Sequence, residues 1–275
     1  MVSRMDSNLK IAILYICTGE YNVFWKDFYI SFEKFFLTSY EKHYFVFTDA
    51  KKIYNEDCYK RIHKIYQKNH GWPENTLFRY EMFFSIREYL KEFDYTFFFN
   101  ANVICKDVIV GEEFLPLKEG LLVVQHPGFF DVPNYRFPYD RNKKSSAYIP
   151  YGKGQVYVCG GINGGKTNVF LDLIKELKNR IELDYKKGII ALWHDESQIN
   201  KYILEHSAYK LLSPSYCYPE GWNIPFIPKL VVLDKNKFID VSNIKKTNER
   251  NEFIIKIKRY LICKFYDLYY WFRRG

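Results

Sequence analysis

Two asparagines spaced two residues apart carry the clearest chemistry in this sequence of 275 residues. Asn100 and Asn102 follow the apolar run 95–99, which predicts a buried strand. Side chains of a strand alternate between its faces, so both amides should leave the strand end on the same side. In open α/β sheets, ligands bind beyond the carboxyl ends of the strands. Two carboxylates here would hold a divalent cation, whereas two neutral amides supply no charge and little affinity for one.

Two further groups of residues could take part in chemistry. Asp195 and Glu196 are adjacent acids that follow Trp193. Asp195 is also a residue type that favours a helix N-cap, and both roles are compatible. Gly160 and Gly161 lack a Cβ and would leave room for a ligand, or would simply form a turn.

The elements that must position these residues follow from the hydrophobic pattern. An apolar strand, an amphipathic helix and a second strand open the chain, and this β-α-β order predicts a parallel sheet with a right-handed crossover. We therefore predict an α/β fold with a mixed, mostly parallel central sheet. The pattern predicts strands at 10–17, 44–48, 95–99, 121–125 and 155–159, the last ending in Gly160 and Gly161, helices at 21–38, 76–91, 168–179 and 195–205, and a long loop at 131–154.

Composition limits the classes of partner. The net charge of +9 favours anionic partners. Residues 245–275 hold nine Lys or Arg and three Asp or Glu, so this tail carries most of the excess and the body is not expected to bind nucleic acid. The six cysteines show no CxxC pair and no metal-ligand spacing, which indicates reduced, intracellular thiols. No apolar run precedes Ile11, and no stretch reaches the roughly 18 residues of a membrane span, so neither a signal peptide nor an anchor is predicted.

The chain divides into a body at 1–242 and a tail at 243–275. Apolar residues recur at helical spacing along the tail, with Lys and Arg beside them. A basic amphipathic helix of this kind suits an anionic membrane surface. The alternative is a C-terminal helix that packs on the body or in an oligomer. We therefore expect a cytoplasmic protein that touches the inner face of the cytoplasmic membrane through this tail.

Eight motifs, in order, resemble glycosyltransferase family 6, the family of the histo-blood-group A and B transferases and the α-1,3-galactosyltransferases. They lie at 44–49 (YFVFTD), 97–102 (FFFNAN), 126–130 (HPGFF), 146–150 (SAYIP), 160–165 (GGINGG), 193–197 (WHDES), 200–202 (NKY) and 212–214 (LSP). The resemblance implies a Rossmann-like fold of the GT-A type. It also implies retaining transfer of Gal or GalNAc from a UDP-sugar to the 3-hydroxyl of an acceptor galactose.

The resemblance also implies which residues form the site. Glu196 would be the catalytic carboxylate, either as nucleophile or by stabilising an oxocarbenium-like state, and His126 and Trp193 would contact the acceptor together with Glu196. Tyr21 would offer a stacking face to the base. The residues implied for donor binding are Ile16, Cys17, Thr18, Tyr21, Arg79, Asn100, Ala101, Asn102, Cys159, Gly160, Gly161, Asp195, Lys229 and Lys235.

Departures from the family pattern refine the expectation. Asn100 and Asn102 stand where relatives carry two metal-binding aspartates, so we predict transfer without a divalent metal or other cofactor. Cations after the last motif, at Lys229, Lys235 or Lys237, would then offset the charge of the diphosphate. The small residues at 160 and 161 favour UDP-GalNAc over UDP-Gal as donor. The acceptor is expected to be a fucosylated galactose, and the absence of an N-terminal anchor indicates a bacterial member. Three alternatives stay open: a galactosyltransferase that uses UDP-Gal, an inactive protein that binds a glycan or nucleotide, and a basic membrane or RNA adaptor that acts through the tail.

Overall fold

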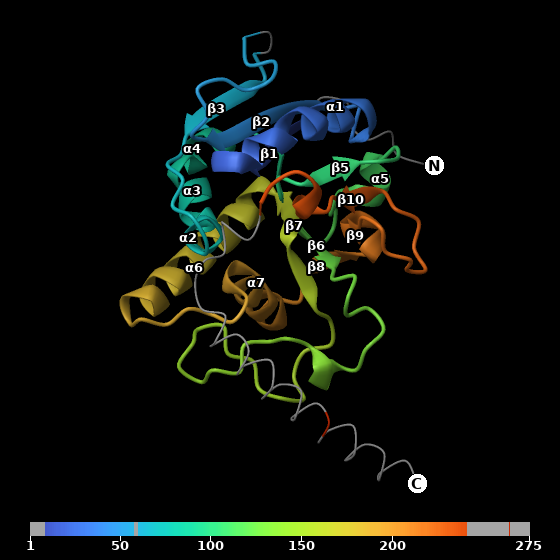
Figure 1. Ribbon diagram of the computed structural model, residues 1–275. Coiled ribbons are helices and arrows are strands. Elements are labelled where there is room, and N and C mark those ends of the chain that lie inside the picture. Colours follow the sequence, from blue (N-terminus) through green and yellow to red (C-terminus); the bar gives the residue numbers. More distant parts are fainter. Residues whose placement is uncertain (1–8, 58–59, 241–263, 265–275) are drawn as a thin grey trace.

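The computed structural model describes residues 9–57, 60–240 and 264, and a seven-stranded mixed sheet runs through this part of the chain (Figure 1). All neighbouring strands are parallel except β7, which is antiparallel to both β4 and β6. The prediction of a mixed, mostly parallel sheet is confirmed. In spatial order the strands are β3 (Ile62–Tyr66), β2 (Glu41–Thr48), β1 (Lys10–Ile16), β4 (Tyr95–Phe99), β7 (Val158–Lys166), β6 (Leu121–Gln125) and β8 (Tyr209–Leu212).

Strand β1 shows how the sheet separates two hydrophobic cores. Ile11, Ile13 and Tyr15 belong to one cluster of buried side chains, and Ala12 and Leu14 belong to the other. This division follows from the two-residue period of a strand. Burial on both faces is typical of parallel strands whose crossover helices cover both sides of a sheet.

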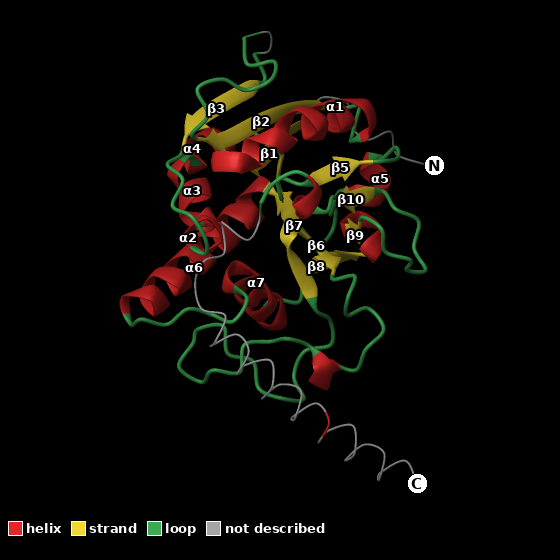
Figure 2. Cartoon of the chain, viewed as in Figure 1, coloured by secondary structure: helices red, strands yellow, loops and turns green. Residues whose placement is uncertain are grey.

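Helices cover the two faces unequally (Figure 2). The helix α1 (Trp25–Phe35) packs against the first core. The second core takes most of its helical side chains from α3 (Arg79–Ser85), α6 (Thr167–Lys186) and α7 (His194–Glu205). Short helices lie at α2 (Glu74–Leu77), α4 (Arg87–Leu90) and α5 (Gly111–Phe114).

A second, three-stranded sheet continues from the end of β4. Its strand β5 (Val103–Cys105) pairs antiparallel with β10 (Leu230–Val232), which pairs in turn with β9 (Tyr218–Pro219). This pairing brings the segment that follows β10 beside the residues that follow β4. Two segments that are more than a hundred positions apart in the sequence thus meet at one edge of the central sheet.

Three predicted elements differ from the structure. The strand predicted to end at Gly160 instead begins at Val158 and continues through the glycines to Lys166. Only glycine fits in its crowded centre, because a Cβ on Gly164 would lie 2.4 Å from the carbonyl oxygen of Thr96 on β4. The helix predicted at 76–91 is divided into α2, α3 and α4, and the helix predicted from residue 21 begins with a 3₁₀ turn at Gly19–Phe24. The short strands β3, β5, β8, β9 and β10 were not predicted.

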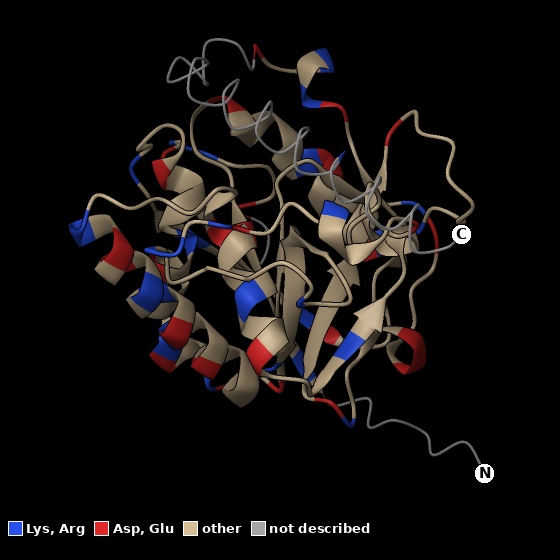
Figure 3. Cartoon of the chain, turned by 90° about the horizontal axis from the view of Figure 1, so that it is seen from below, with Lys and Arg blue, Asp and Glu red and all other residues tan. Residues whose placement is uncertain are grey.

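Both signs of charge are interspersed over the described part of the chain (Figure 3). On α6, for example, Lys178 pairs with Glu182 and Arg180 pairs with Glu176. No helix within the described residues is long and apolar enough to cross a membrane. The predicted tail at 243–275 lies outside those residues, apart from Lys264.

Candidate active site

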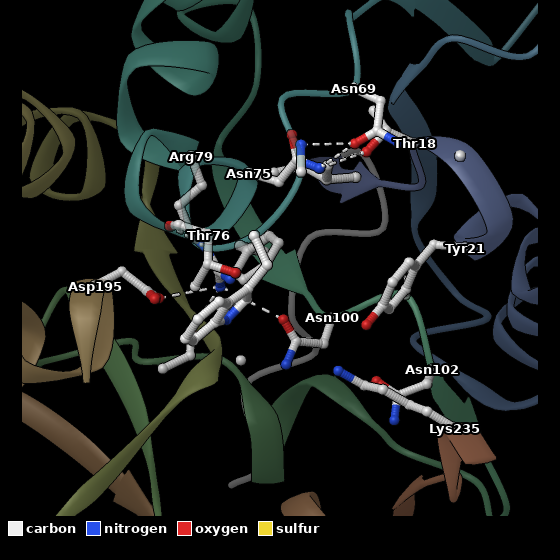
Figure 4. A pocket seen from close by; sticks show the side chains of 18 of the residues that line it. Thr18, Tyr21, Asn69, Asn75, Thr76, Arg79, Asn100, Asn102, Asp195 and Lys235 are labelled. Carbon is white, nitrogen blue, oxygen red and sulfur yellow. Dashed lines mark hydrogen bonds and ion pairs between the residues drawn. The ribbon is translucent and has the colours of Figure 1, made fainter. Parts of the chain in front are cut away.

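A cavity of about 540 Å³ lies at the carboxyl ends of β1 and β4 (Figure 4). It is bounded by the loop after β1, a segment leading into α3, the end of β4, strand β7, the start of α7 and the segment after β10. The lining residues are Ile16, Thr18, Gly19, Glu20, Tyr21, Asn69, Gly71, Trp72, Asn75, Thr76, Arg79, Phe98, Asn100, Ala101, Asn102, Gly160, Gly161, Trp193, Asp195, Glu196 and Lys235.

Side-chain amides hold one wall of the cavity together. The Nδ2 of Asn75 donates to Oδ1 of Asn69 at 2.7 Å and to Oγ1 of Thr18 at 3.1 Å. Gly19 has φ +59°, and a Cβ there would lie 2.6 Å from the amide nitrogen of Asn69. The backbone nitrogen of Gly19 donates to Oδ1 of Asp49. The loop after β1 is thereby joined to the segment that leads into α2.

The aromatic ring of Tyr21 and the ammonium of Lys235 lie side by side in the lining of the cavity. The Nζ of Lys235 lies 5.1 Å from the ring centroid of Tyr21, and both side chains line the cavity. A cation over a phenol ring is a favourable contact. This pair can offer a stacking surface and a positive charge to one ligand.

The guanidinium of Arg79 connects three elements beneath the cavity. Its Nη1 lies 3.1 Å from Oδ2 of Asp195, 3.3 Å from the carbonyl oxygen of Gly160 and 3.4 Å from Oδ1 of Asn100. Its carbon Cζ lies 4.6 Å from the centroid of the Phe98 ring. Only 7% of the Arg79 residue is exposed, so the guanidinium is a fixed charge in the floor of the cavity.

The two acids of α7 have different partners. Burial raises the pKa of Asp195 to about 7, although the Arg79 guanidinium lowers it. The carboxylate of Glu196 accepts from the Tyr157 hydroxyl at 2.7 Å and from the Gly160 backbone nitrogen at 2.9 Å. Burial raises the pKa of Glu196, while those two hydrogen bonds lower it. Trp193, not Asp195, is the N-cap residue of α7, so the acids are available to the cavity.

The two asparagines use opposite ends of their amides. Asn100 accepts from Arg79 through Oδ1. Asn102 donates from Nδ2 to the carbonyl oxygen of Leu233 at 2.6 Å. The Oδ1 of Asn102 is buried and has no hydrogen-bond partner among the described residues. The prediction that both side chains face one site is confirmed, since both line the cavity.

The glycines of β7 allow this close packing. A Cβ on Gly161 would lie 2.2 Å from Nδ2 of Asn100, and a Cβ on Gly160 would lie 2.9 Å from Oδ2 of Asp195. Both positions are extended strand rather than the predicted turn. The glycines therefore keep one wall of the cavity flat and let polar side chains from β4 and α7 approach it.

Three residues predicted to bind the donor do not line the cavity. Cys17 and Cys159 are buried in the first core, and burial raises the pKa of the Cys17 thiol to about 12. Lys229 forms an ion pair with Glu113. Cys17 and Cys159 point into the core, whereas their chain neighbours Ile16, Thr18 and Gly160 line the cavity. Lys229 directly precedes β10 and pairs with Glu113 beside the small sheet.

The predicted acceptor residues are divided between the cavity and the packing behind it. Trp193 lines the cavity and is 38% exposed. His126 does not line it, and packs against the rings of Phe129 and Tyr157. Its Nδ1 accepts from the Gly128 nitrogen, and burial lowers its pKa to about 4. His126 is therefore a neutral imidazole.

Sequence reasoning missed several residues of the site. Trp72 and Asn75 line the cavity, and the Asn, Gly and Pro residues around them are the signal that could have marked a binding loop. Tyr157, which holds Glu196, had no local signal because its partner lies 39 positions away.

The described residues contain no group of three or more His, Cys, Asp or Glu side chains that could hold a metal ion. At the cavity, the oxygen of Asn100 already accepts from Arg79, and the carboxylate of Asp195 is paired with the same guanidinium. Divalent cations of the Mg²⁺ and Mn²⁺ class prefer charged oxygen ligands. These donors do not fit such a cation.

Comparison with known proteins identifies similar chains. Residues 3–244 match the family described as Glycosyltransferase family 6. The O-antigen biosynthesis glycosyltransferase WbnI of Escherichia coli is 37% identical over 86% of this chain and all of its own length. The globoside alpha-1,3-N-acetylgalactosaminyltransferase 1 of Gallus gallus is 31% identical over 84% of this chain and 69% of its own. The histo-blood group ABO system transferase 1 of Rattus norvegicus is 33% identical over 78% of this chain and 63% of its own length.

Proposed function

The chain belongs to glycosyltransferase family 6, and on that premise we propose that it moves GalNAc from UDP-GalNAc to the 3-hydroxyl of an acceptor galactose, with retention and without a divalent metal. The seven-stranded mixed α/β sheet is consistent with the GT-A fold of such enzymes. The observation that carries the proposal is the composition of one cavity, in which aromatic rings, the two cations Arg79 and Lys235, and three carboxylates that include Asp195 and Glu196 lie together at the carboxyl ends of the strands.

The cations support binding of the UDP part of the donor. Lys235 lies beside the ring of Tyr21, and Arg79 lies at the cavity floor. In our proposal the uracil stacks on Tyr21 and the diphosphate meets the ammonium of Lys235. As the sugar–phosphate bond breaks, negative charge grows on the leaving UDP, and fixed cations stabilise it.

The carboxylates support the chemistry at the sugar. Tyr157 and Gly160 hold the carboxylate of Glu196 by two hydrogen bonds, so the group is oriented before the substrate arrives. Retaining transfer passes through an oxocarbenium-like state that a nearby carboxylate stabilises or attacks. We assign that role to Glu196, and we assign Asp195 to the hydroxyls of the donor sugar.

Independence from a divalent metal is supported by the donor atoms at Asn100 and Asn102. The oxygen of Asn100 faces a guanidinium, and the oxygen of Asn102, which has no hydrogen-bond partner among the described residues, belongs to a neutral amide that supplies no charge to a cation. The charge that a metal would supply at the diphosphate is assigned to Lys235 instead.

Gly160 and Gly161 line the cavity without adding a side chain to it, and this supports the choice of donor. The space that their Cβ atoms would take is occupied by Asn100, Asp195 and Glu196. The Gallus gallus relative, named as an N-acetylgalactosaminyltransferase, agrees with that choice. On the acceptor side, Trp193 offers an apolar face at the cavity, and we propose a fucosylated galactose as its ligand.

The test is transfer from UDP-GalNAc and from UDP-Gal to fucosylated and plain lactose, with excess EDTA throughout. We expect GalNAc transfer to the fucosylated acceptor that EDTA does not reduce, and loss of that transfer in Glu196→Gln. Transfer that requires added Mn²⁺ would contradict the metal-free site. A preference for UDP-Gal would contradict the donor assignment. UDP binding without any transfer would favour the inactive, nucleotide-binding alternative.

A further inference from the structure

We propose that Asn102 is a positioning residue whose amide nitrogen fastens the segment 230–239 to the cavity, and so places Lys235 before any donor binds. The sequence position of Asn102 suggests a ligand-binding role, but its side chain bonds the backbone of Leu233, and its own backbone carbonyl accepts from Leu233 in return. The consequence for UDP binding rests on the proposed function, whereas the fastening itself can be measured without a ligand.

The contact between the two segments is reciprocal. The Nδ2 of Asn102 donates to the carbonyl oxygen of Leu233 at 2.6 Å, and the backbone nitrogen of Leu233 donates to the carbonyl oxygen of Asn102 at 2.8 Å. The preceding residues continue the same pairing, since Val232 lies opposite Val103 in the small sheet. Asn102 therefore makes the last contact of this ladder, and its contact is made by a side chain rather than by the backbone alone.

The residues after Leu233 deliver the cation. A 3₁₀ turn at Lys235–Lys237 begins at Asp234, whose carboxylate accepts from the Asn236 nitrogen. Lys235 then lies over the ring of Tyr21, and the ring of Phe238 packs 5.2 Å from the ring of Phe24. The turn is short, so a shift at Leu233 moves the ammonium of Lys235 with it.

The chemistry of the contact requires an amide. A carbonyl oxygen only accepts hydrogen bonds, so the atom of Asn102 that faces Leu233 must be the nitrogen. An aspartate at position 102 would set a carboxylate oxygen against a carbonyl oxygen at a site that is 2% exposed. Buried acceptors that face each other lose a hydrogen bond and repel. Asn100 differs, because its oxygen accepts from the Arg79 guanidinium. An aspartate at position 100 would still accept that hydrogen bond.

The first experiment is hydrogen–deuterium exchange on the full chain without ligand, in EDTA. In Asn102→Asp we expect backbone amides of 230–239 to exchange about tenfold faster or more, as expected for loss of a buried hydrogen bond. Amides of β1 and β4 should keep their wild-type rates, which shows that the variant folds. Asn102→Ala removes the amide without adding charge and should give the same result. Asn100→Asp, the matched control for added charge, should leave the exchange of 230–239 unchanged.

The second experiment asks whether the fastening acts through Lys235. UDP affinity is measured by calorimetry for wild type, Asn102→Ala, Lys235→Ala and the double variant. We expect each single substitution to weaken UDP binding about tenfold, and the double variant to bind no worse than either, because both remove one shared contact. If Lys235→Ala weakened UDP binding by the same factor in the wild type and in Asn102→Ala, the proposal would be overturned. It would also be overturned if the backbone amides of 230–239 exchanged at the wild-type rate in both Asn102→Asp and Asn102→Ala. If the wild type binds no UDP, the proposed function fails, and the exchange result alone decides the role of Asn102.

Discussion

At the scale of single residues, the site depends on the hydrogen bonds that orient Glu196. Its two carboxylate oxygens accept from Tyr157 and Gly160, and its backbone carbonyl accepts from Asn200. Tyr157 is fully buried and contacts the ring of His126 behind the cavity. The hydroxyl of Tyr157 is thus a fixed donor in an otherwise aromatic environment.

We predict that Tyr157→Phe lowers kcat about tenfold or more, because a hydrogen bond to a charged group contributes about 1.5–3 kcal/mol. The hydrogen bond lowers the pKa of Glu196, so its loss raises that pKa further. The carboxylate is the active form, and activity is lost as pH falls through its pKa. The acidic limb of kcat against pH should therefore move to higher pH. The adjacent acid Asp195, with a pKa of about 7, will titrate together with Glu196.

The control for this substitution is Tyr139→Phe. Tyr139 packs against Tyr157, but its hydroxyl donates to the carbonyl oxygen of Val156. The Tyr139→Phe variant should therefore keep the acidic limb of kcat against pH at its wild-type position. A shift of equal size in both variants would mean that aromatic packing, rather than the bond to Glu196, controls the titration.

At the scale of elements, strand β7 determines the shape of the site. It is the antiparallel strand between β4 and β6, and its glycines let side chains of β4 and α7 approach its backbone. A strand with this many glycines has weak intrinsic preference for extended structure, so tertiary pairing decides its extent.

We predict that Gly161→Ala raises the KM for the donor about tenfold, because the added methyl would lie 2.2 Å from Nδ2 of Asn100 and must displace that side chain from Arg79. Steady-state kinetics with varied UDP-GalNAc measure the change. Gly188→Ala is the control: nothing lies within 4 Å of its Cβ, and its φ of +68° adds only backbone strain. It should lower thermal stability while the donor KM stays as in the wild type. An unaltered donor KM in Gly161→Ala would show that the cavity tolerates a side chain there.

At the scale of the whole molecule, the described cavity lies within the body. The residues that line the cavity lie between 16 and 235, and the family match ends at residue 244. The basic tail at 243–275 lies outside the described residues apart from Lys264, and its contact with an anionic membrane stays a prediction. The tail carries a net charge of +6, which would attract an anionic surface electrostatically.

We predict that a chain truncated after residue 242 keeps kcat/KM within about twofold with soluble acceptors, since every residue known to line the cavity lies between 16 and 235. The same truncation should abolish sedimentation with vesicles that contain anionic lipid. Vesicles of neutral lipid serve as the control, and they should bind neither chain. Loss of activity with a soluble acceptor would instead show that the tail is part of the catalytic body.

The sequence by itself determined the class of fold and the location of the site. Apolar runs that form strands, amphipathic helices between them and polar residues at a strand end are local signals, and they place Asn100 and Asn102 beyond the end of a buried strand. The resemblance to the family added Thr18 to the same site. The order of short motifs identified the family. These features depend on residues that are close in the chain, so no three-dimensional information is needed to find them.

Only the tertiary structure decided what each polar group contacts. Asn102 bonds a backbone 131 positions away, and Arg79 bonds the carbonyl of Gly160 81 positions away. Cys17 and Cys159 belong to the core instead of the cavity. These outcomes depend on which strands become neighbours and on which face each side chain occupies. Long-range pairing sets both, because the buried donors and acceptors of distant segments must satisfy one another once water is excluded.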